Sequence, residues 1–233
     1  MSGSPTASSS PSDQECDQDE GAPPSLLIGL TGGIASGKSA VSERMAQRGA
    51  VVIDADVLSR YALQPGGEGL AEVVEAFGSG VLHPDGSLDR AALGEIVFAD
   101  QQSRERLNAI VHPRVRLQAA RLRASAQPGS IVVEDIPLLV ESGQVDRFDV
   151  VVVVQAPEQE RIRRIVEDRG GTQADAQARM AAQATDAQRA ALADVILDND
   201  GSLEDLNLRV DELMSQLRRR VQKASARRSC EAG

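Results

Sequence analysis

Residues 26–41 read LLIGLTGGIASGKSAV, and this stretch decides the fold expected for the whole chain. The apolar run Leu26–Thr31 has the length and composition of one buried strand. A glycine-rich turn follows it, and a helix is expected from about Gly37 to Gln47, with Gly49 as its C-terminal stop. A buried strand that leads through such a turn into a helix is typical of a phosphate-binding loop in an α/β protein.

The turn from Gly32 to Ser39 matches the pattern G-x-x-x-x-G-K-[ST] at every fixed position. Its glycines allow the backbone to wrap closely around phosphate groups, so that several N–H groups and the helix N-terminus point toward them. Lys38 is expected between the β- and γ-phosphates of a nucleoside triphosphate, and the Ser39 hydroxyl is expected to bind Mg²⁺. The residues expected to bind the triphosphate are Gly33, Ile34, Ala35, Ser36, Gly37, Lys38, Ser39 and Ala40.

The rest of the chain continues the alternation of apolar runs and helical patterns. The other expected strands are residues 50–53, 131–133, 149–154 and 195–197. The expected helical segments are 57–64, 69–77, 89–126 with a break at His112-Pro113, 158–168, 173–190 and 202–220. Strands that are apolar on both faces and alternate with helices predict a mostly parallel five-stranded sheet in a three-layer α/β/α fold. The long helical stretch before the third strand predicts an inserted subdomain that holds the phosphate acceptor.

Acidic residues lie at the carboxyl ends of two expected strands, where ligands bind in such sheets. In Ile53-Asp54-Ala55-Asp56, the two carboxylates are expected on one side of an extended segment. Each could orient or deprotonate an attacking hydroxyl, or cap the next helix. The two alternatives stay open for Asp54, and a functional role is favoured for Asp56. Asp135 ends the third strand and is a candidate for orienting the metal indirectly, with Glu134 as its neighbour.

Composition and charge exclude several classes of function. The formal net charge of −10 argues against non-specific binding to nucleic acids, whose phosphates would be repelled. No stretch approaches the ~20 apolar residues that span a bilayer, and no secretory signal is visible, so a cytoplasmic location without membrane contact is expected. The two cysteines, Cys16 and Cys230, lie in opposite tails, which argues against a disulfide framework and a zinc site.

Five segments together resemble dephospho-CoA kinases, in order and at similar spacings. They are LTGGIASGKSAV, VVIDADVLSR, HPRV, VVEDIPLLVESG and AAQATDAQR, and the similarity runs from about Leu26 to Leu217. The resemblance implies a P-loop kinase that uses ATP and Mg²⁺ to phosphorylate the 3′-hydroxyl of the ribose of dephospho-CoA, the last step of CoA synthesis. The expected partner is a small-molecule acceptor, and the expected oligomeric state is a monomer.

Residues can be carried over from the resemblance one at a time. Lys38 and Ser39 match the family's P-loop lysine and serine, and Asp56 matches the second aspartate of its D-A-D motif, the base or hydroxyl-orienting group. His112 lies in the substrate-side helical region, where it either contacts the acceptor or marks a helix break before Pro113. Pro137 and Leu138 resemble the loop that lines the acceptor pocket. Two positions depart from the family pattern, Ala35 where glycine is common and Ala40 where threonine is common.

The resemblance also implies a lid over about residues 164–185, in which Arg164 aligns with a lid arginine and is expected to be catalytic. Guanidinium groups suit phosphate, and a closed lid excludes water. The alternative for Arg161, Arg163, Arg164 and Arg169 is a solvated helix with pairs such as Glu160–Arg164.

Composition and the resemblance together divide the chain into regions. These are an acidic, disordered tail (1–24), a nucleotide core (25–56, 130–160 and 194–217), a helical substrate subdomain (57–129), the lid and a basic C-terminal tail (218–233). Two other functions stay open. One is another small-molecule or nucleoside monophosphate kinase, from which the D-A-D motif and VVEDIPLL separate this chain. The other is a nucleotide-dependent switch, against which the missing N-K-x-D motif argues.

Overall fold

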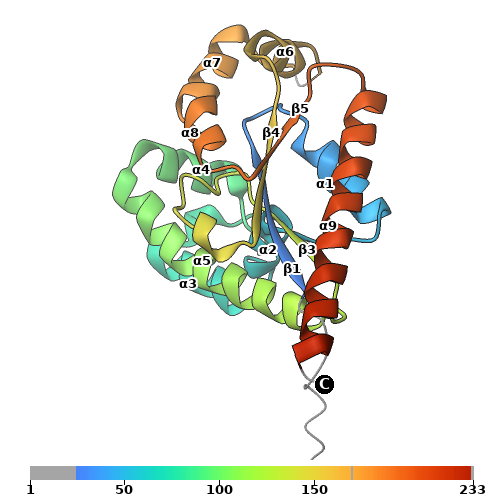
Figure 1. Ribbon diagram of the computed structural model, residues 1–233. Coiled ribbons are helices and arrows are strands. Elements are labelled where there is room, and N and C mark those ends of the chain that lie inside the picture. Colours follow the sequence, from blue (N-terminus) through green and yellow to red (C-terminus); the bar gives the residue numbers. More distant parts are fainter. Residues whose placement is uncertain (1–24, 169, 232–233) are drawn as a thin grey trace, which may run out of the picture.

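A computed structural model of the chain describes residues 25–168 and 170–231 and contains the expected sheet at its centre (Figure 1). The sheet has five strands in the order β2-β3-β1-β4-β5, and every pairing is parallel. The strands are β1 (Leu26–Gly32), β2 (Val51–Asp54), β3 (Ile131–Asp135), β4 (Val150–Gln155) and β5 (Val195–Asp198). Since all five run in the same direction, their carboxyl ends meet at one edge, as the sequence predicted.

Two helices, α1 (Lys38–Gln47) and α9 (Leu203–Glu231), cover one face of the sheet, on the right in Figure 1. Their apolar side chains interdigitate with those of the central strands, and each large one contributes roughly 1.5–3 kcal/mol by its burial. The most buried members of this core are Ile28, Leu30, Val41, Met45, Val133, Val152, Leu206, Val210 and Met214. The core is aliphatic, as the scarcity of aromatic residues requires.

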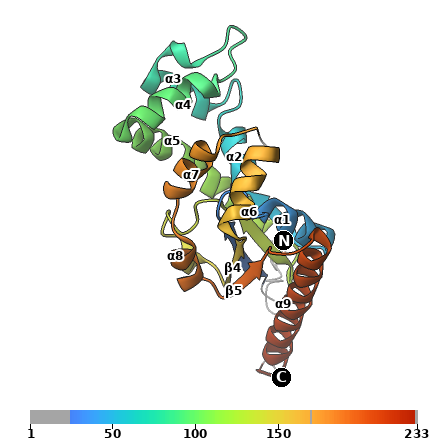
Figure 2. The same ribbon diagram turned by 90° about the horizontal axis from the view of Figure 1, so that it is seen from above.

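The opposite face of the sheet is covered by α2 (Ala55–Ala62), α5 (Gln101–Ala124) and α8 (Asp186–Ala191). The helices α3 (Glu68–Phe77) and α4 (Arg90–Ala99) pack on α5 and share a separate apolar core with it. Figure 2 shows α3 and α4 projecting away from the sheet, on the side remote from α9. This arm corresponds to the long helical insertion expected between the second and third strands.

The helix α5 corrects one prediction, because it runs without interruption through Pro113. The break lies earlier, at Asp100, whose carboxylate accepts a hydrogen bond from Ser103 N (2.7 Å) and so caps α5. Proline removes one N–H from the helix ladder and disturbs the turn before it. Here the Ile110 carbonyl accepts a hydrogen bond from Arg114 Nη1 (2.8 Å), and packing on α2, α3 and α4 holds the helix together.

The segment after β4 is also divided differently from the prediction. Helix α6 (Glu158–Arg163) continues into a π-helical turn, η3 (Arg164–Asp168), and residues 173–190 form two helices, α7 (Gln173–Ala181) and α8. Two capping boxes explain the division, because Thr172 with Asp175 and Thr185 with Gln188 each satisfy the first N–H groups of a new helix. Short 3₁₀ turns, η1 (Ser79–Val81) and η2 (Val145–Arg147), complete the fold.

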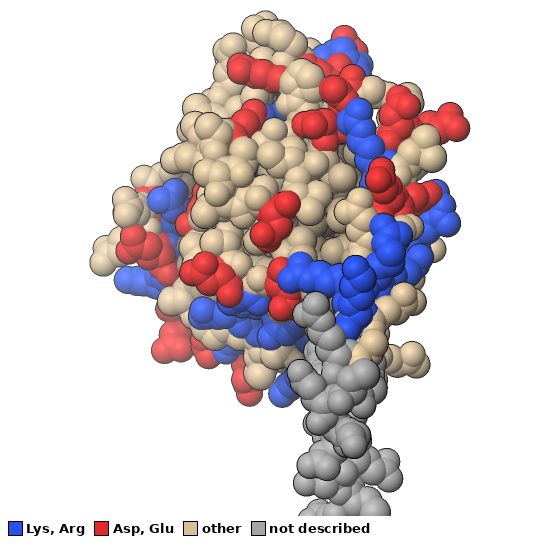
Figure 3. Space-filling model, in the orientation of Figure 1, with Lys and Arg blue, Asp and Glu red and all other residues tan. Residues whose placement is uncertain are grey.

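The final helix extends beyond the expected end near residue 220 and includes the basic stretch 218–223. Figure 3 shows Lys and Arg side chains gathered over the lower parts of α5 and α9. Residues 1–24, for which disorder is expected, lie outside the described residues. The same holds for the lid residue Arg169 and for the side chains of both cysteines. Within the described part, no helix is both long and apolar enough to cross a membrane.

The carboxylate of Asp211 joins α9 to α1 through two arginines. It accepts hydrogen bonds from Arg44 Nε (2.8 Å) and Nη2 (2.7 Å) and from Arg48 Nε (2.6 Å). The Arg44 guanidinium first, and then that of Arg48, hold the pKa of Asp211 well below its ordinary value. A depressed folded-state pKa stabilises the fold above the unfolded pKa of about 3.9 and loses this contribution as pH falls.

Asp211→Asn should therefore lower the melting temperature at pH 7 by a few degrees. The deficit should shrink as pH is lowered below about 4, because the unfolded wild-type chain then takes up a proton at Asp211 while the folded chain still holds this carboxylate ionised. Thermal unfolding followed by circular dichroism between pH 7 and pH 3 measures both effects, with the exposed neighbour Glu212→Gln as the matched control. A deficit that stays constant with pH would contradict this account.

Candidate active site

The loop between β1 and α1 closes into a tight cup at the carboxyl edge of the sheet. Gly37 adopts φ 96° and Ala35 adopts φ 59°, so two residues of the loop have left-handed backbone conformation. A methyl group on Gly32 would lie 2.6 Å from Ser36 Oγ and 2.7 Å from the Val154 carbonyl oxygen, so only glycine fits there. The geometry is that of an anion-binding nest at a helix N-terminus.

Beside the loop, Lys38 forms an ion pair with Asp135. Lys38 Nζ donates to Asp135 Oδ1, and the Asp135 side chain is only 5% exposed. Burial raises the pKa of Asp135, and the Lys38 ammonium group opposes this rise. In register, Asp135 lies between Leu30 on β1 and Asp54 on β2. The lysine that the sequence assigned to phosphate is thus paired with the carboxylate assigned to the metal.

The D-A-D motif does not lie on one extended segment, which corrects the prediction of carboxylates on the same side of a strand. Helix α2 begins at Ala55, and Asp54 is its N-cap, with Oδ1 accepting from Asp56 N (2.8 Å) and Val57 N (3.0 Å). Of the two alternatives left open for Asp54, the structure shows the capping contact, and a direct role in the reaction stays untested. Asp56 lies exposed in the first turn, and its carboxylate makes no hydrogen bond or ion pair within the described residues.

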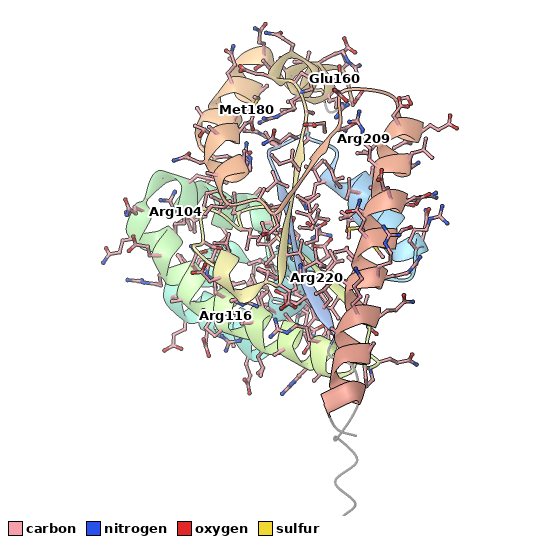
Figure 4. The ribbon with its side chains drawn as sticks, in the orientation of Figure 1. Arg104, Arg116, Glu160, Met180, Arg209 and Arg220 are labelled. Carbon is pink, nitrogen blue, oxygen red and sulfur yellow. The ribbon has the colours of Figure 1, made fainter. Side chains whose placement is uncertain are left out.

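Arg164, from the segment after β4, also contacts the phosphate loop. Its Nη1 donates to the Ala35 carbonyl (3.2 Å), and its Nε donates to Glu160 Oε1 (2.9 Å). The Glu160–Arg164 pair expected for the solvated helix is present, while the lid role of Arg164 stays a prediction. Arg163 points away and pairs with Glu160 (2.7 Å) and Glu167 (2.7 Å). The arginines, Arg163 first, lower the pKa of Glu160 to about 2, and Figure 4 shows this residue on α6.

The residues predicted for the acceptor side are spread over two elements. Pro137 follows β3, and its carbonyl accepts from Thr31 Oγ1 (3.1 Å), while Leu138 is 49% exposed next to it. His112 is exposed on α5, and its pKa lies below the ordinary value because of partial burial and the nearby Arg116, which is labelled in Figure 4. No hydrogen bond or ion pair among the described residues joins His112 to the loop.

The sequence reading missed several side chains that hold the outer surface of the loop. Asn199 Nδ2 donates to the Ser36 carbonyl (2.8 Å), Arg161 Nε donates to the Ile34 carbonyl (3.0 Å), and Gln183 Oε1 accepts from Ile34 N (2.8 Å). Asn199 directly follows β5, so the strand-end rule that located Asp135 also points to it. Gln183 lies in the segment AAQATDAQR, so the family resemblance marks its position but not its contact with Ile34, and no sequence signal marks the particular role of Arg161.

Glu134, expected only as a neighbour of Asp135, is buried and holds α5 to the sheet. Its carboxylate is 4% exposed and pairs with Arg123 on α5 and with Arg147 (3.1 Å). A buried carboxylate needs such partners, because an unpaired charge there would cost several kcal/mol. This residue therefore supports the fold near the site.

The side chains at the loop suit Mg²⁺, which takes few ligands from the protein, better than a metal ion that is held by protein ligands alone. No group of three His, Cys, Asp or Glu side chains in the described part of the chain could hold an ion. Mg²⁺ is usually bound through one or two protein oxygens together with substrate phosphates and water. The exposed Ser39 hydroxyl at the start of α1 and the Asp135 carboxylate fit that pattern.

The two left-handed positions of the loop, Gly37 and Ala35, should respond to substitution with effects of very different size. In Gly37→Ala, the new methyl group would clash with Asn199 Nδ2, at a φ that alanine disfavours. The change should cost about 2 kcal/mol or more in stability and weaken nucleotide binding at least about tenfold. Ala35→Gly relieves strain but increases chain entropy in the unfolded state, so stability should change by less than about 1 kcal/mol. Chemical denaturation of both variants, with titration of Gly37→Ala by an ATP analogue, measures the contrast. Equal destabilisation of the two variants would contradict it.

The parallel sheet, the closed loop and the lysine at its end define a P-loop nucleotide-binding protein of the kinase type. Among solved structures, TT1252 from Thermus thermophilus is similar to this chain, at 34% identity and a TM-score of 0.72, covering 83% of this chain and 98% of that one. Dephospho-CoA kinase from Campylobacter jejuni shares the fold at 23% identity and a TM-score of 0.59, covering 83% of this chain and 97% of that one.

Sequence comparison makes the assignment more specific. The family described as dephospho-CoA kinase matches residues 26–205. The dephospho-CoA kinase of Thermobifida fusca is 52% identical over 196 residues, which is 84% of this chain and 98% of that protein. That of Mycobacterium tuberculosis H37Rv is 51% identical over 87% of this chain, which spans 52% of that longer relative. The chain belongs to the dephospho-CoA kinase family.

Proposed function

We propose that the chain transfers the γ-phosphate of ATP to the 3′-hydroxyl of the ribose of dephospho-CoA, giving CoA and ADP. The observation that carries the proposal is the meeting of Lys38 and the strand-end carboxylates at one edge of the sheet, in a chain of this family. A kinase of this family implies ATP as the phosphate donor, and the loop is shaped for its phosphates.

On the donor side, the inward N–H groups of the loop bind the β-phosphate, and Lys38 moves from Asp135 to the β- and γ-phosphates. Ser39 and Asp135 would hold Mg²⁺, which neutralises charge on the phosphate oxygens. Arg164, whose Nη1 donates to the Ala35 carbonyl of the loop, would turn its guanidinium group to the γ-phosphate. These cations oppose the charge that develops in the transition state.

On the acceptor side, Asp56 accepts the proton of the ribose hydroxyl as its oxygen attacks the γ-phosphorus. The new O–P bond forms as the bond from phosphorus to the β,γ-bridging oxygen breaks, and ADP leaves with that electron pair. The free, exposed carboxylate of Asp56 suits this role, since Asp54 is occupied as a helix cap. Pro137, Leu138 and His112 are proposed to contact the rest of the acceptor.

The test is an ADP-release assay coupled to NADH oxidation, run with Mg²⁺, ATP and a panel of acceptors. Dephospho-CoA should give turnover well above buffer, and mass spectrometry should show one added phosphoryl group on its 3′ position. AMP, shikimate and gluconate serve as acceptors of other kinases with related folds. The proposal is wrong if dephospho-CoA at saturating concentration gives no release while another acceptor does. A cytoplasmic monomer remains a prediction, and sedimentation of the purified chain measures the oligomeric state.

A further inference from the structure

Two buried arginines meet one carboxylate behind the phosphate loop. Arg161 on α6 and Arg189 on α8 are each 3% exposed. Arg161 Nη1 lies 2.9 Å from Asp186 Oδ1 and 3.1 Å from Oδ2, and Arg189 Nη2 also donates to Asp186 Oδ1. The cluster holds two positive charges and one negative charge, so one positive charge is left over.

The cluster lies directly against the loop. Arg161 Nε donates to the Ile34 carbonyl (3.0 Å). A methyl group built on Gly33 would lie 2.7 Å from Arg161 Nη2 and 2.8 Å from Arg189 Nη2. Glycine at position 33 is therefore needed so that both guanidinium groups can approach the backbone.

This arrangement is a costly way to hold helices together. Burying a guanidinium group costs several kcal/mol unless partners compensate it, and apolar side chains of similar size often stabilise a fold equally well. Arg189 Nε is buried and has no hydrogen-bond partner among the described residues, which adds to the cost. A left-over positive charge makes sense where an anion binds, and the phosphate loop is such a place.

We propose that Arg161, Asp186 and Arg189 are positioning residues for the nucleotide. Arg161 holds the Ile34 carbonyl outward so that the neighbouring N–H groups face the phosphates. Asp186 fixes Arg161 and Arg189, and the excess positive charge beside Gly33 favours the bound triphosphate. Since Asp186 and Arg189 belong to α8, the cluster also couples the segment after the lid to the loop. The proposal rests on the proposed function only in taking ATP as the nucleotide.

Arg161→Lys and Asp186→Asn test the proposal by calorimetric titration with Mg²⁺ and a non-hydrolysable ATP analogue, without acceptor. Arg161→Lys keeps the charge but cannot hold Ile34 and Asp186 together. Asp186→Asn increases the net positive charge but releases Arg161, and the lost positioning should outweigh the added charge. Each should raise the Kd about tenfold, and the double variant should be no worse than either single one, because the residues act as a unit. Arg163→Lys, on the same helix but facing solvent, is the matched control and should leave the Kd within about twofold.

Kinetics and stability separate positioning from a structural role. In the phosphorylation assay, KM for ATP should rise about tenfold while KM for dephospho-CoA stays within about twofold. Gly33→Ala, which pushes both guanidinium groups away, should weaken analogue binding similarly and without additivity to Asp186→Asn.

The proposal is overturned if the melting temperature falls while the Kd of the analogue is unchanged, or if both KM values rise equally. Normal analogue binding by the wild-type chain without transfer to dephospho-CoA would refute the proposed function alone, because the titration still tests the cluster.

Discussion

Replacing Lys38 by alanine should lower the rate of phosphoryl transfer by at least about 1000-fold, or about 4 kcal/mol in transition-state stabilisation. Lys38 is the cation at the end of the loop, and its partner Asp135 holds it at the strand edge where the phosphates must lie. Without it, charge on the β- and γ-phosphates is no longer neutralised as the bond breaks. The ADP-release assay measures the loss, and the KM for dephospho-CoA should change little.

The same substitution leaves the buried carboxylate of Asp135 without its cation, which by itself destabilises the fold. Burial already raises the pKa of Asp135, and removing Lys38 should raise it further. The double variant Lys38→Ala/Asp135→Asn therefore provides the control. It should recover most of the melting temperature that Lys38→Ala loses, yet stay inactive. Activity restored together with stability would show that Lys38 acts only in folding.

The central architecture of the chain was predictable because it depends on local patterns. Runs such as Leu26–Thr31 are apolar on both faces, and that is a property of strands covered by helices on both sides. The P-loop signature lies between such a strand and a helix, so its place at the carboxyl edge followed from the order of elements alone. The parallel sheet was confirmed for this reason, while the contact of Lys38 with phosphate stays a prediction.

Helix boundaries were predicted less well, because competing local interactions decide them. A proline indicates a break, but at Pro113 packing and the Arg114–Ile110 hydrogen bond outweigh it. In the other direction, nothing in the alanine-rich stretch 173–190 looks like a break, and the Thr185 capping box creates one. Asp54 shows the same competition, since an aspartate after a strand is equally suited to catalysis and to an N-cap.

The side-chain contacts that hold the phosphate loop could not be predicted, because the residues that make them are far apart in the sequence. Arg161 meets Ile34 across 127 residues, and Asn199 meets Ser36 across 163 residues. Such pairs depend on which strands are neighbours, and a single sequence does not specify the strand order. The arginines after β4 were identified as a group, but Arg161 faces inward and Arg163 outward only because of how α6 packs.

Asp56→Asn should reduce turnover by about 100- to 10,000-fold while the affinity for ATP stays within about threefold. The amide keeps the size and hydrogen-bonding reach of the side chain but cannot accept the proton of the acceptor hydroxyl. Asp56 lies outside the phosphate loop, in the first turn of α2, so ATP binding does not depend on its charge. Steady-state kinetics with both substrates varied, together with titration by an ATP analogue, separate the two effects.

Asp54→Asn is the matched control, because it makes the same chemical change two residues earlier, at the same carboxyl edge of the sheet. Asp54 acts through Oδ1 as an N-cap, and asparagine caps helices about as well as aspartate, so folding should be preserved. Turnover should fall far less than in Asp56→Asn. If Asp54→Asn proves the more damaging change, the base is Asp54, and its hydrogen bonds to Asp56 N and Val57 N must break when the acceptor binds. The comparison thus decides which carboxylate of the motif takes the proton.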